Sequence, residues 1–396
     1  MANPEVTLKP GREHTLRRGH PWVFATSIAR EPQGLAPGAS VDVLDATGAW
    51  LARGAWSPAS QIRVRAWTWQ RDEAIDAAFF RRRLAAALRL RETLGLGGHE
   101  GACRVLNAEG DGLPGVVLDR YGPHLVAQFL SAGAEAFREE IARAALEATA
   151  CRGVYERSDV EVRAKEGLPQ RAGALLGDEP PPEITIREGE LRLLVDVRNG
   201  HKTGLYLDQR DNRAAVAPFV RGARVLNVFC YTGGFGLAAG VAGASQVTQL
   251  DQSAPALELA RRNAELNGTA ARTEHVQADA FAKLREWRDE GRRFDLIVLD
   301  PPKFVASAAQ LDSARRGYKD INLLGFKLLA PGGVLCTFSC SGHMQPEMFR
   351  ETVAEAAADA RVQAQVLRQL GQAPDHPFGL HYPEGFYLKG LMLRVM

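Results

Sequence analysis

The pattern of apolar and polar positions divides the chain into regions of different predicted secondary structure. Near the start, residues 41–45 and 62–67 alternate between apolar and polar side chains, which is typical of strands with one buried face. Because Gly and Pro separate these runs, residues 1–70 are predicted to form a small β-barrel-like module. A helix is predicted over residues 74–94, where apolar residues recur at helical spacing: Phe79, Phe80, Leu84 and Leu88.

The segment after the first module contains both predicted helices and predicted strands. After that helix, a turn-rich stretch leads into a strand over residues 115–119, and residues 125–130 are its expected hairpin partner. A further helix is expected over residues 135–150. From about Leu191 strands alternate with helices, which is the rhythm of a parallel sheet covered by helices. The fold class is therefore α/β, with a Rossmann-like domain over residues 191–396.

Composition and charge narrow the class of protein. The formal net charge of the 396 residues is +2, so any nucleic-acid binding must come from local basic patches. The chain lacks a secretory signal and a long apolar run, so we expect a cytoplasmic protein with no membrane span. Five cysteines without CxxC spacing argue against a disulfide scaffold and a cysteine-rich zinc site, and no metal site is predicted.

Polar residues follow four successive predicted strands of the C-terminal region. The strand over residues 224–229 runs into a glycine-rich turn, CYTGGFG, and a helix, where free backbone N–H groups can meet a ligand. The next three strands are followed by Asp251, Asp279 and Asp300. Any one of these acids could be a simple strand-end cap. Together they predict ligand-binding loops along one carboxyl edge, with Asp251 facing ribose hydroxyls and Asp279 the adenine edge.

Both NAD and S-adenosylmethionine could use such an edge. The glycine cluster is GGFG rather than the GxGxxG of dinucleotide-binding proteins. The fourth strand ends in DPPKF (residues 300–304), a motif that binding of a nicotinamide cofactor does not require. Pro301 and Pro302 fix an extended backbone whose carbonyls, beside the Asp300 carboxylate, can bind the polar edge of a flat base. The pattern therefore favours a methyltransferase over a dehydrogenase.

Cys340 is the candidate nucleophile. It follows the fifth predicted strand (residues 333–339) and so falls at the same edge as Asp300, whereas Cys336 lies within the strand and is expected to be a buried apolar residue. A thiolate that adds to carbon 6 of a pyrimidine makes carbon 5 nucleophilic toward a sulfonium methyl group. Asp300 would hydrogen-bond the ring nitrogen and amine of cytosine. Cys230, inside the glycine-rich turn, is better suited to backbone contact.

Two other functions remain open from the residues alone. Methylation of an exocyclic amine of adenine or guanine would use Asp-Pro-Pro and an aromatic residue but no cysteine. A non-catalytic RNA-binding assembly factor would retain only the cofactor fold.

The motifs as a set resemble the RlmI family of bacterial 23S ribosomal RNA cytosine-5 methyltransferases, over essentially the whole chain. The motifs that carry the resemblance are GHPWVF (residues 19–24), NAEGDGLPG (107–115), ERSD (156–159), GHKTGLYLDQRDNR (200–213), NVFCYTGGFG (227–236), DPPKF (300–304) and FSCSGH (338–343). This similarity implies a PUA domain over residues 1–70, an intermediate α/β domain over 71–190 and a class I methyltransferase domain over 191–396.

The resemblance also implies site residues. Catalysis would rest on Cys340 and Asp300, and cofactor contacts would come from Asn227, Phe229, Tyr231, Thr232, Gly233, Gly234, Asp251, Asp279, Ala280, Asp300 and, near the methionine end, Gln209. Two departures stand out. Many RNA cytosine-5 enzymes have Pro-Cys after the fourth-strand Asp, where this chain has Pro301-Pro302, and Asn227 stands where related enzymes often carry an acid.

RNA contacts follow from the PUA resemblance. Arg12, Arg17 and Arg18 at the start of the first module are the expected phosphate ligands, and Lys202 and Lys303 are candidates near the target cytosine. If about four phosphates are contacted, a plot of the logarithm of the affinity against the logarithm of the salt concentration should have a slope of about −3. The implied partner is 23S ribosomal RNA, free or in a pre-ribosomal particle. The oligomeric state stays open, a homodimer included.

Overall fold

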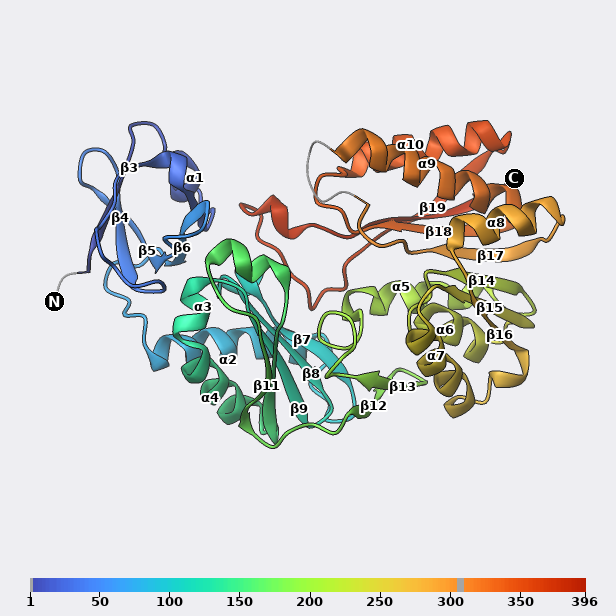
Figure 1. Ribbon diagram of the computed structural model, residues 1–396, viewed down its shortest axis with the longest axis horizontal. Coiled ribbons are helices and arrows are strands. Elements are labelled where there is room, and N and C mark those ends of the chain that lie inside the picture. Colours follow the sequence, from blue (N-terminus) through green and yellow to red (C-terminus); the bar gives the residue numbers. More distant parts are fainter. Residues whose placement is uncertain (1–2, 305–309) are drawn as a thin grey trace. The chain divides into compact units, whose positions relative to one another are not determined.

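The computed structural model describes residues 3–304 and 310–396, which form two compact units. Unit 1 comprises Met1–Ile186, Val195–Leu207 and Pro374–Gly385, and unit 2 comprises Arg187–Leu194, Asp208–Ala373 and Phe386–Met396. Figure 1 shows the helices and strands of both units. The predicted PUA and intermediate regions therefore share one unit, together with two segments from the C-terminal half of the chain.

Unit 1 begins with a six-stranded sheet. Its strands are paired in the linear order β2-β6-β5-β4-β1-β3, and all pairs are antiparallel except β1 with β4. Alternate residues such as Val41, Val43 and Val64 are fully buried, as the sequence pattern predicts. The elements are β1 (Glu5–Leu8), α1 (His14–Arg17), β2 (Trp22–Phe24), β3 (Ile28–Arg30), β4 (Ser40–Leu44), β5 (Trp50–Trp56) and β6 (Ile62–Thr68).

A second sheet of unit 1 has five strands in the order β11-β10-β9-β8-β7. The predicted helix is α2, which begins after Asp76 because that carboxylate caps it by accepting a hydrogen bond from Phe79 N. The predicted hairpin is the antiparallel pair β8–β9. The elements are α2 (Ala77–Thr93), β7 (Ala102–Asn107), β8 (Val116–Tyr121), β9 (His124–Phe129), α3 (Ala132–Ala136), α4 (Arg138–Thr149), β10 (Gly153–Ser158) and β11 (Arg171–Gly177). A two-stranded sheet, β12 (Glu183–Glu188) with β13 (Leu191–Asp196), follows.

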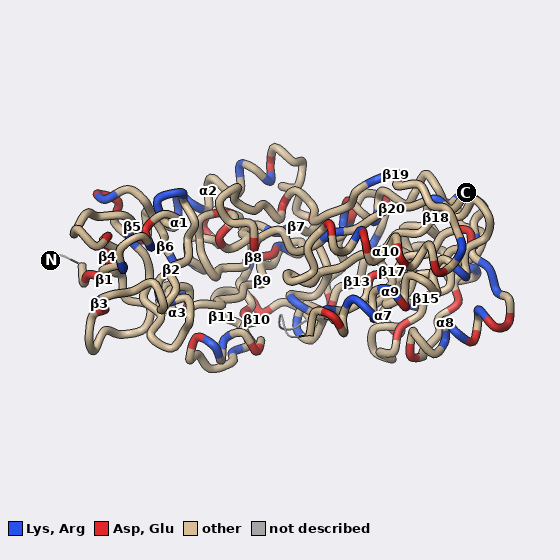
Figure 2. The backbone as a smooth tube through the Cα atoms, turned by 90° about the horizontal axis from the view of Figure 1, so that it is seen from above, with Lys and Arg blue, Asp and Glu red and all other residues tan. Residues whose placement is uncertain are grey.

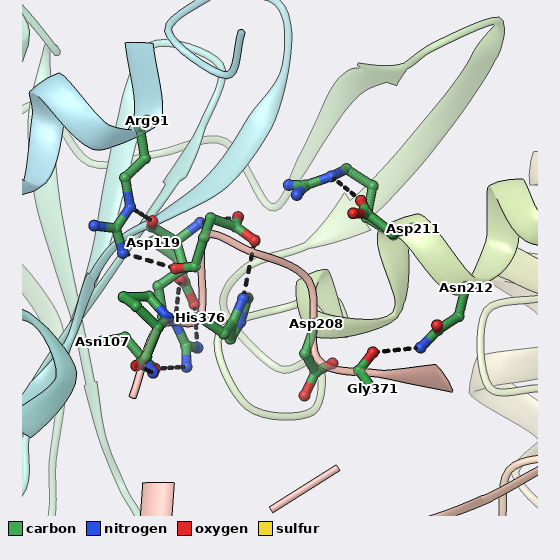
Figure 3. Close-up of polar contacts among 12 residues, drawn as sticks. Arg91, Asn107, Asp119, Asp208, Asp211, Asn212, Gly371 and His376 are labelled. Carbon is green, nitrogen blue, oxygen red and sulfur yellow. Dashed lines mark hydrogen bonds and ion pairs between the residues drawn. The ribbon is translucent and has the colours of Figure 1, made fainter. Parts of the chain in front are cut away.

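The segment Pro374–Gly385 is fixed within unit 1 by buried polar contacts (Figure 3). Asp375 is fully buried, and its carboxylate accepts a hydrogen bond from Arg104 N at 3.0 Å. Arg91 donates to the Asp375 carbonyl and forms a bidentate ion pair with Asp111. At Gly110 a Cβ atom would lie 1.9 Å from the carbonyl oxygen of Pro377, so only glycine fits. The NAEGDGLPG motif thus holds this returning segment in place.

Unit 2 is built on a seven-stranded sheet in the order β16-β15-β14-β17-β18-β20-β19. The strands β14 to β18 are parallel, and β20 runs antiparallel to both β18 and β19. The strands are β14 (Arg224–Val228), β15 (Gln246–Asp251), β16 (Thr273–Gln277), β17 (Phe294–Leu299), β18 (Leu329–Ser339), β19 (Ala364–Gly371) and β20 (Lys389–Val395). The five parallel strands are those predicted from the sequence. The order reverses between β14 and β17, where α/β sheets bind ligands beyond the carboxyl ends of the strands.

Helices cover both faces of this sheet (Figure 1). On one face lie α5 (Arg210–Ala215), α6 (Gly234–Val241) and α7 (Ala254–Leu266), and on the other α8 (Ala280–Asp289), α9 (Leu311–Leu328) and α10 (Pro346–Ala360). The buried strand residues Leu226, Ile297 and Leu335 belong to the main core of the unit. None of the helices formed by the described residues is long and apolar enough to cross a membrane.

Candidate active site

The loop after β14 forms a tight turn at the carboxyl edge of the unit 2 sheet. Three of its residues have positive φ angles: Phe229 at 58°, Tyr231 at 48° and Gly233 at 86°. Left-handed backbone is unfavourable for residues with a Cβ atom, so surrounding contacts must hold Phe229 and Tyr231 in place. Gly233 then caps α6, whose first residue is Gly234. The predicted glycine-rich turn therefore lies where the sequence places it, at the N-terminus of a helix.

Asp251 holds this loop from the neighbouring strand. Its carboxylate accepts hydrogen bonds from Tyr231 N at 2.8 Å and from Ser253 N at 2.9 Å. Thr232 is buried, and its carbonyl accepts a hydrogen bond from Asn263 of α7. Because Asp251 is itself only half-buried, its carboxylate remains at the edge where a ligand would bind.

Asn227 and Gln249 form a buried amide pair beneath the loop. Asn227 Nδ2 donates to Gln249 Oε1 at 2.8 Å, and Gln249 Nε2 donates to the Gly233 carbonyl at 3.0 Å. Both side chains are about 1% exposed. A Cβ atom at Gly236 would lie 2.4 Å from Gln249 Nε2, so the glycine at this position is required by the protein's own packing. Asn227 therefore supports the turn through Gln249.

Asp279 lies at the end of the next strand, β16. Its Oδ1 atom accepts a hydrogen bond from Ala282 N and so caps α8, while the residue is exposed. Ala280, the first residue of α8, is buried. With Asp251 and Asp300, Asp279 gives three carboxylates after three strands of the same parallel sheet.

Asp300 follows β17 and is oriented by Gln209. Gln209 Nε2 donates to Asp300 Oδ2 at 2.9 Å. The buried Gln209 side chain is positioned in turn by Asn212, which donates from Nδ2 to Gln209 Oε1 at 2.6 Å and to the Gly371 carbonyl at 2.8 Å. Figure 3 shows the contact between Asn212 and Gly371. A chain of amide groups thus runs from β19 to the Asp300 carboxylate.

The rest of DPPKF is anchored by its aromatic residue. Phe304 packs on the buried Tyr318 of α9, with ring centroids 4.8 Å apart, and on Phe281 of α8 at 6.1 Å. Between Asp300 and this anchor, Pro301 is buried, whereas Pro302 and Lys303 are exposed. Pro302 and Lys303 are therefore available at the surface of the site.

Cys340 lies directly after β18, the parallel neighbour of β17. Leu299 pairs with Thr337, so Asp300 and Cys340 leave the sheet at adjacent strand ends. The residues on either side of Cys340 are fixed through the Tyr318 hydroxyl, which accepts a hydrogen bond from Ser339 Oγ at 2.9 Å and lies 3.3 Å from Ser341 Oγ. Cys340 itself is half-buried.

The other thiols of unit 2 are poorly suited to nucleophilic attack. Burial raises the pKa of Cys336 to about 12. Burial and the nearby Asp251 carboxylate raise the pKa of Cys230 well above its ordinary value. Since only the thiolate is nucleophilic, these shifts leave Cys340 as the candidate among the unit 2 cysteines.

The predicted basic residues differ in their surroundings. Arg12 and Arg18 are exposed, whereas Arg17 pairs with Asp45 at 2.5 Å. Lys202 has a positive φ of 54° and lies 4.6 Å from the centre of the Tyr206 ring. Lys303 is exposed. Figure 2 shows acidic positions interspersed with basic ones along the chain, as the low net charge predicts.

Two further arginines, Arg63 and Arg65, lie two residues apart in β6. Arg65 is buried and pairs with Glu166 at 2.9 Å, so it is a structural charge of unit 1. Arg63 pairs with Glu31 at 3.5 Å.

Several residues that shape the site carry no motif in the sequence. They are Gln249, Asn263, Tyr318 and Lys389, whereas Asn212 lies within the 200–213 motif without having been predicted as a site residue. Gln249 had the clearest signal, because it lies between Thr248 and Leu250 in a predicted strand of the central sheet, and a polar group buried there must find a partner. Lys389 begins the apolar run of β20 and gave no such signal.

The carboxyl edge suits S-adenosylmethionine by the chemistry of its donors. The molecule carries a sulfonium and an ammonium group, and its ribose and adenine present hydrogen-bond donors. Carboxylates at the ends of β15 and β17 and at Asp279, beside the N-terminus of α6, match these groups.

Comparisons with known proteins agree with this chemistry. Residues 125–379 match the family of S-adenosylmethionine-dependent methyltransferases, and residues 6–69 match the PUA-like domain. The chain is 53% identical to ribosomal RNA large subunit methyltransferase I of Aeromonas hydrophila, over 98% of this chain and 99% of that protein. It is 51% identical to the protein of the same name from Erwinia tasmaniensis, over 99% of both.

Solved structures show the same fold over the whole chain. A protein from Streptococcus mutans, described as a SAM-dependent methyltransferase, aligns with a TM-score of 0.85 and 22% identity over 100% of both chains. A methyltransferase crystallised in complex with SAH aligns with a TM-score of 0.86, also at 22% identity over 100% of both chains.

Proposed function

Because this chain belongs to the family of ribosomal RNA large subunit methyltransferase I, we propose that it methylates carbon 5 of a cytosine in 23S ribosomal RNA. It is an S-adenosylmethionine-dependent enzyme with a PUA-like domain. The observation that carries the proposal is the placement of Asp300 and Cys340 at the ends of the adjacent parallel strands β17 and β18.

Cys340 begins the proposed reaction. Its S–H proton passes to solvent, and the thiolate forms a bond from sulfur to carbon 6 of the cytosine. The electron pair of the bond between carbons 5 and 6 then becomes available at carbon 5. S-adenosylmethionine would supply an electrophilic methyl group: carbon 5 would bond to this methyl as its bond to the sulfonium breaks, leaving a neutral thioether. The proton of carbon 5 leaves to a base, the double bond re-forms and the Cys340 thiolate departs, so atoms and charge balance.

Asp300 would hold the target base. A carboxylate beside the ring can hydrogen-bond the exocyclic amine and the protonated ring nitrogen of cytosine, which stabilises the charge that builds up in the adduct. The hydrogen bond from Gln209 fixes the direction of this carboxylate. Pro301 and Pro302 would keep the following backbone extended beside the base.

The cofactor would be held by the loop after β14 and by the neighbouring strand ends. Asp251 would accept hydrogen bonds from the ribose and Asp279 from the adenine amine, while Gly233 and Gly234 let the backbone approach. Phe229, Tyr231, Thr232 and Ala280 would line this pocket, and Gln209 would lie near the methionine end. Asn227 would act indirectly, by holding Gln249, which in turn binds the Gly233 carbonyl of the loop.

The RNA would be bound through exposed basic residues. Arg12 and Arg18 of the PUA-like domain would contact phosphates, and Arg17 would contribute less to phosphate binding. Lys202 and Lys303 would contact the RNA backbone near the extruded cytosine. The proposed substrate is 23S ribosomal RNA, free or in a pre-ribosomal particle, in the cytoplasm where ribosomes are assembled.

The test is to map methylated nucleotides by mass spectrometry in 23S RNA incubated with the enzyme and S-adenosylmethionine. We expect 5-methylcytosine at one site and a loss of about 10³-fold or more in rate for Cys340→Ala. An RNA with 5-fluorocytosine at that site should form an adduct with Cys340 that survives a denaturing gel, because fluorine cannot leave as the proton does.

Cys151→Ala is the matched control, since Cys151 is a half-buried thiol in unit 1 and should leave the rate unchanged. A methyl group on an exocyclic amine, formed equally well by Cys340→Ala, would replace the carbon-5 proposal with amine methylation. An unmodified RNA, together with no binding of S-adenosylmethionine, would favour an assembly factor.

A further inference from the structure

Lys389 is a buried lysine at the carboxyl edge of the unit 2 sheet. It begins β20, lies opposite Ser339 in the antiparallel pairing with β18, and is 5% exposed. Its Nζ atom donates a hydrogen bond to the Ser341 carbonyl at 2.6 Å. The Lys389 ammonium group therefore contacts the three-residue strand end, Ser339 to Ser341, that has Cys340 at its centre.

No carboxylate among the described residues forms an ion pair with Lys389. The titratable groups that act on it are the Cys340 thiol, from the end of β18, and the Lys303 ammonium, from the loop after β17. The Tyr318 hydroxyl of α9 contacts Ser339 and Ser341 of the same strand end and is also within electrostatic range of Cys340. Two of these groups can become anions, the Cys340 thiol and the Tyr318 hydroxyl, and burial raises the pKa of Tyr318.

A buried ammonium group without a carboxylate is unfavourable, and a neutral donor could satisfy one carbonyl equally well. The second lysine nearby, Lys303, makes the positive charge less favourable still. A thiolate at Cys340 would offset both effects. We propose that Lys389 is a positioning residue whose ammonium charge stabilises the thiolate form of Cys340, which rests on Cys340 being the nucleophile of the proposed function.

The balance of protons is simple in this arrangement. The Cys340 proton leaves to water, Lys389 keeps its own, and the thiolate and ammonium form a neutral pair. Burial lowers the pKa of Lys389 to about 8, and the neighbouring thiolate opposes this shift, so the lysine is mainly protonated at pH 7. Lys389 does not touch the substrate in this role.

The test compares Lys389→Gln, which keeps an N–H donor but removes the charge, with Lys389→Arg, which keeps the charge. The full-length protein is alkylated with iodoacetamide across a pH series, and modification of the Cys340 peptide is followed by mass spectrometry. We expect the midpoint for Cys340 to rise by about one pH unit or more in Lys389→Gln, a loss of about tenfold in rate at neutral pH, and to return toward the wild-type value in Lys389→Arg.

Methyl transfer provides a second readout. The acid limb of the pH dependence of kcat should move upward in Lys389→Gln by the same amount, with little change in KM. An unchanged alkylation midpoint in a folded Lys389→Gln protein overturns the inference. If the midpoint moves but Cys340→Ala still methylates RNA, the pairing of Lys389 with the thiol is supported while the proposed carbon-5 chemistry fails.

Discussion

Gln209 donates a hydrogen bond to the Asp300 carboxylate across 2.9 Å, and Gln209 is itself almost completely buried. A buried amide has one preferred direction when both of its ends are bonded, and Asn212 binds the other end of this one. The Asp300 carboxylate therefore meets its ligand with its orientation already set, which lowers the entropic cost of binding. Gln209 comes from the segment before α5 and Asp300 from the end of β17, so the two meet only in the folded unit.

Removal of the Gln209 donor should lower activity without unfolding the protein. Hydrogen bonds to charged groups contribute about 1.5–3 kcal/mol, so Gln209→Leu should reduce kcat/KM by about 10- to 150-fold. Steady-state methyl transfer to 23S RNA measures this effect. The control is Gln369→Leu on the exposed strand β19, which should stay near the wild-type value. Equal activity of Gln209→Leu and wild type would show that the orientation of Asp300 does not matter.

The turn after β14 should be sensitive to one added methyl group. Alanine in place of a helical glycine usually stabilises a helix by about 1 kcal/mol. At Gly236, however, the new Cβ would lie 2.4 Å from Gln249 Nε2, so overpacking should outweigh that gain. We expect Gly236→Ala to lower the free energy of unfolding by about 1–3 kcal/mol and to weaken binding of S-adenosylmethionine. Urea unfolding and calorimetry measure the two effects.

Gly98→Ala is the control for Gly236→Ala, because a Cβ atom at Gly98 would meet nothing within 4 Å. Its unfolding curve should match that of the wild type. A Gly236→Ala protein as stable as Gly98→Ala would mean that Gln249 moves aside at little cost.

The predicted RNA contacts should appear in the salt dependence of binding. Each phosphate contact to single-stranded RNA contributes about 0.7 to the slope of log affinity against log salt. Arg12→Gln and Arg18→Gln should each reduce the slope by about that amount, and Arg17→Gln by less, because Asp45 already neutralises Arg17. Fluorescence anisotropy with a labelled 23S fragment measures the slopes. Exposed Arg221, before β14, serves as the control, and a slope indifferent to Arg12 and Arg18 would remove them from the interface.

The sequence predicted the elements whose signals are local. Strands β14 to β18 lie where their apolar runs place them, and the helix predicted over residues 74–94 is α2, although it begins only at Ala77, after the Asp76 cap. The edge that gathers Asp251, Asp279 and Asp300 could also be predicted, since parallel strands end on the same side of a sheet.

Contacts between distant parts of the chain could not be predicted in this way. The pairing of Asp375 with Arg104 assigns residues 374–385 to unit 1, although they lie within the region predicted as one C-terminal domain. The insertion of β20 between β18 and β19 brings Lys389 beside Cys340, and no local pattern announces it. The motif NAEGDGLPG carried a family resemblance, but its physical role became visible only through the fit of Gly110 against Pro377.

The stability of unit 2 should depend on pH through Lys389. Burial lowers its folded-state pKa to about 8, below the ordinary value of 10.5. Between these two pH values the unfolded chain binds a proton that the folded chain has lost. The free energy of unfolding therefore increases as the pH rises from about 8 to 10.5, and it decreases again as the pH is lowered toward 8. Lys389→Met removes this dependence. The difference between wild type and Lys389→Met should change by about 2 kcal/mol between about pH 8 and about pH 10, in favour of wild type at high pH. Urea unfolding, monitored by hydrogen exchange of β18 and β20, measures this difference in the free energy of unfolding. Lys327→Met, at an exposed lysine, is the control. If the difference in the free energy of unfolding stays constant between about pH 8 and about pH 10, Lys389 has the same pKa in the folded and unfolded chain, and the expected shift is wrong.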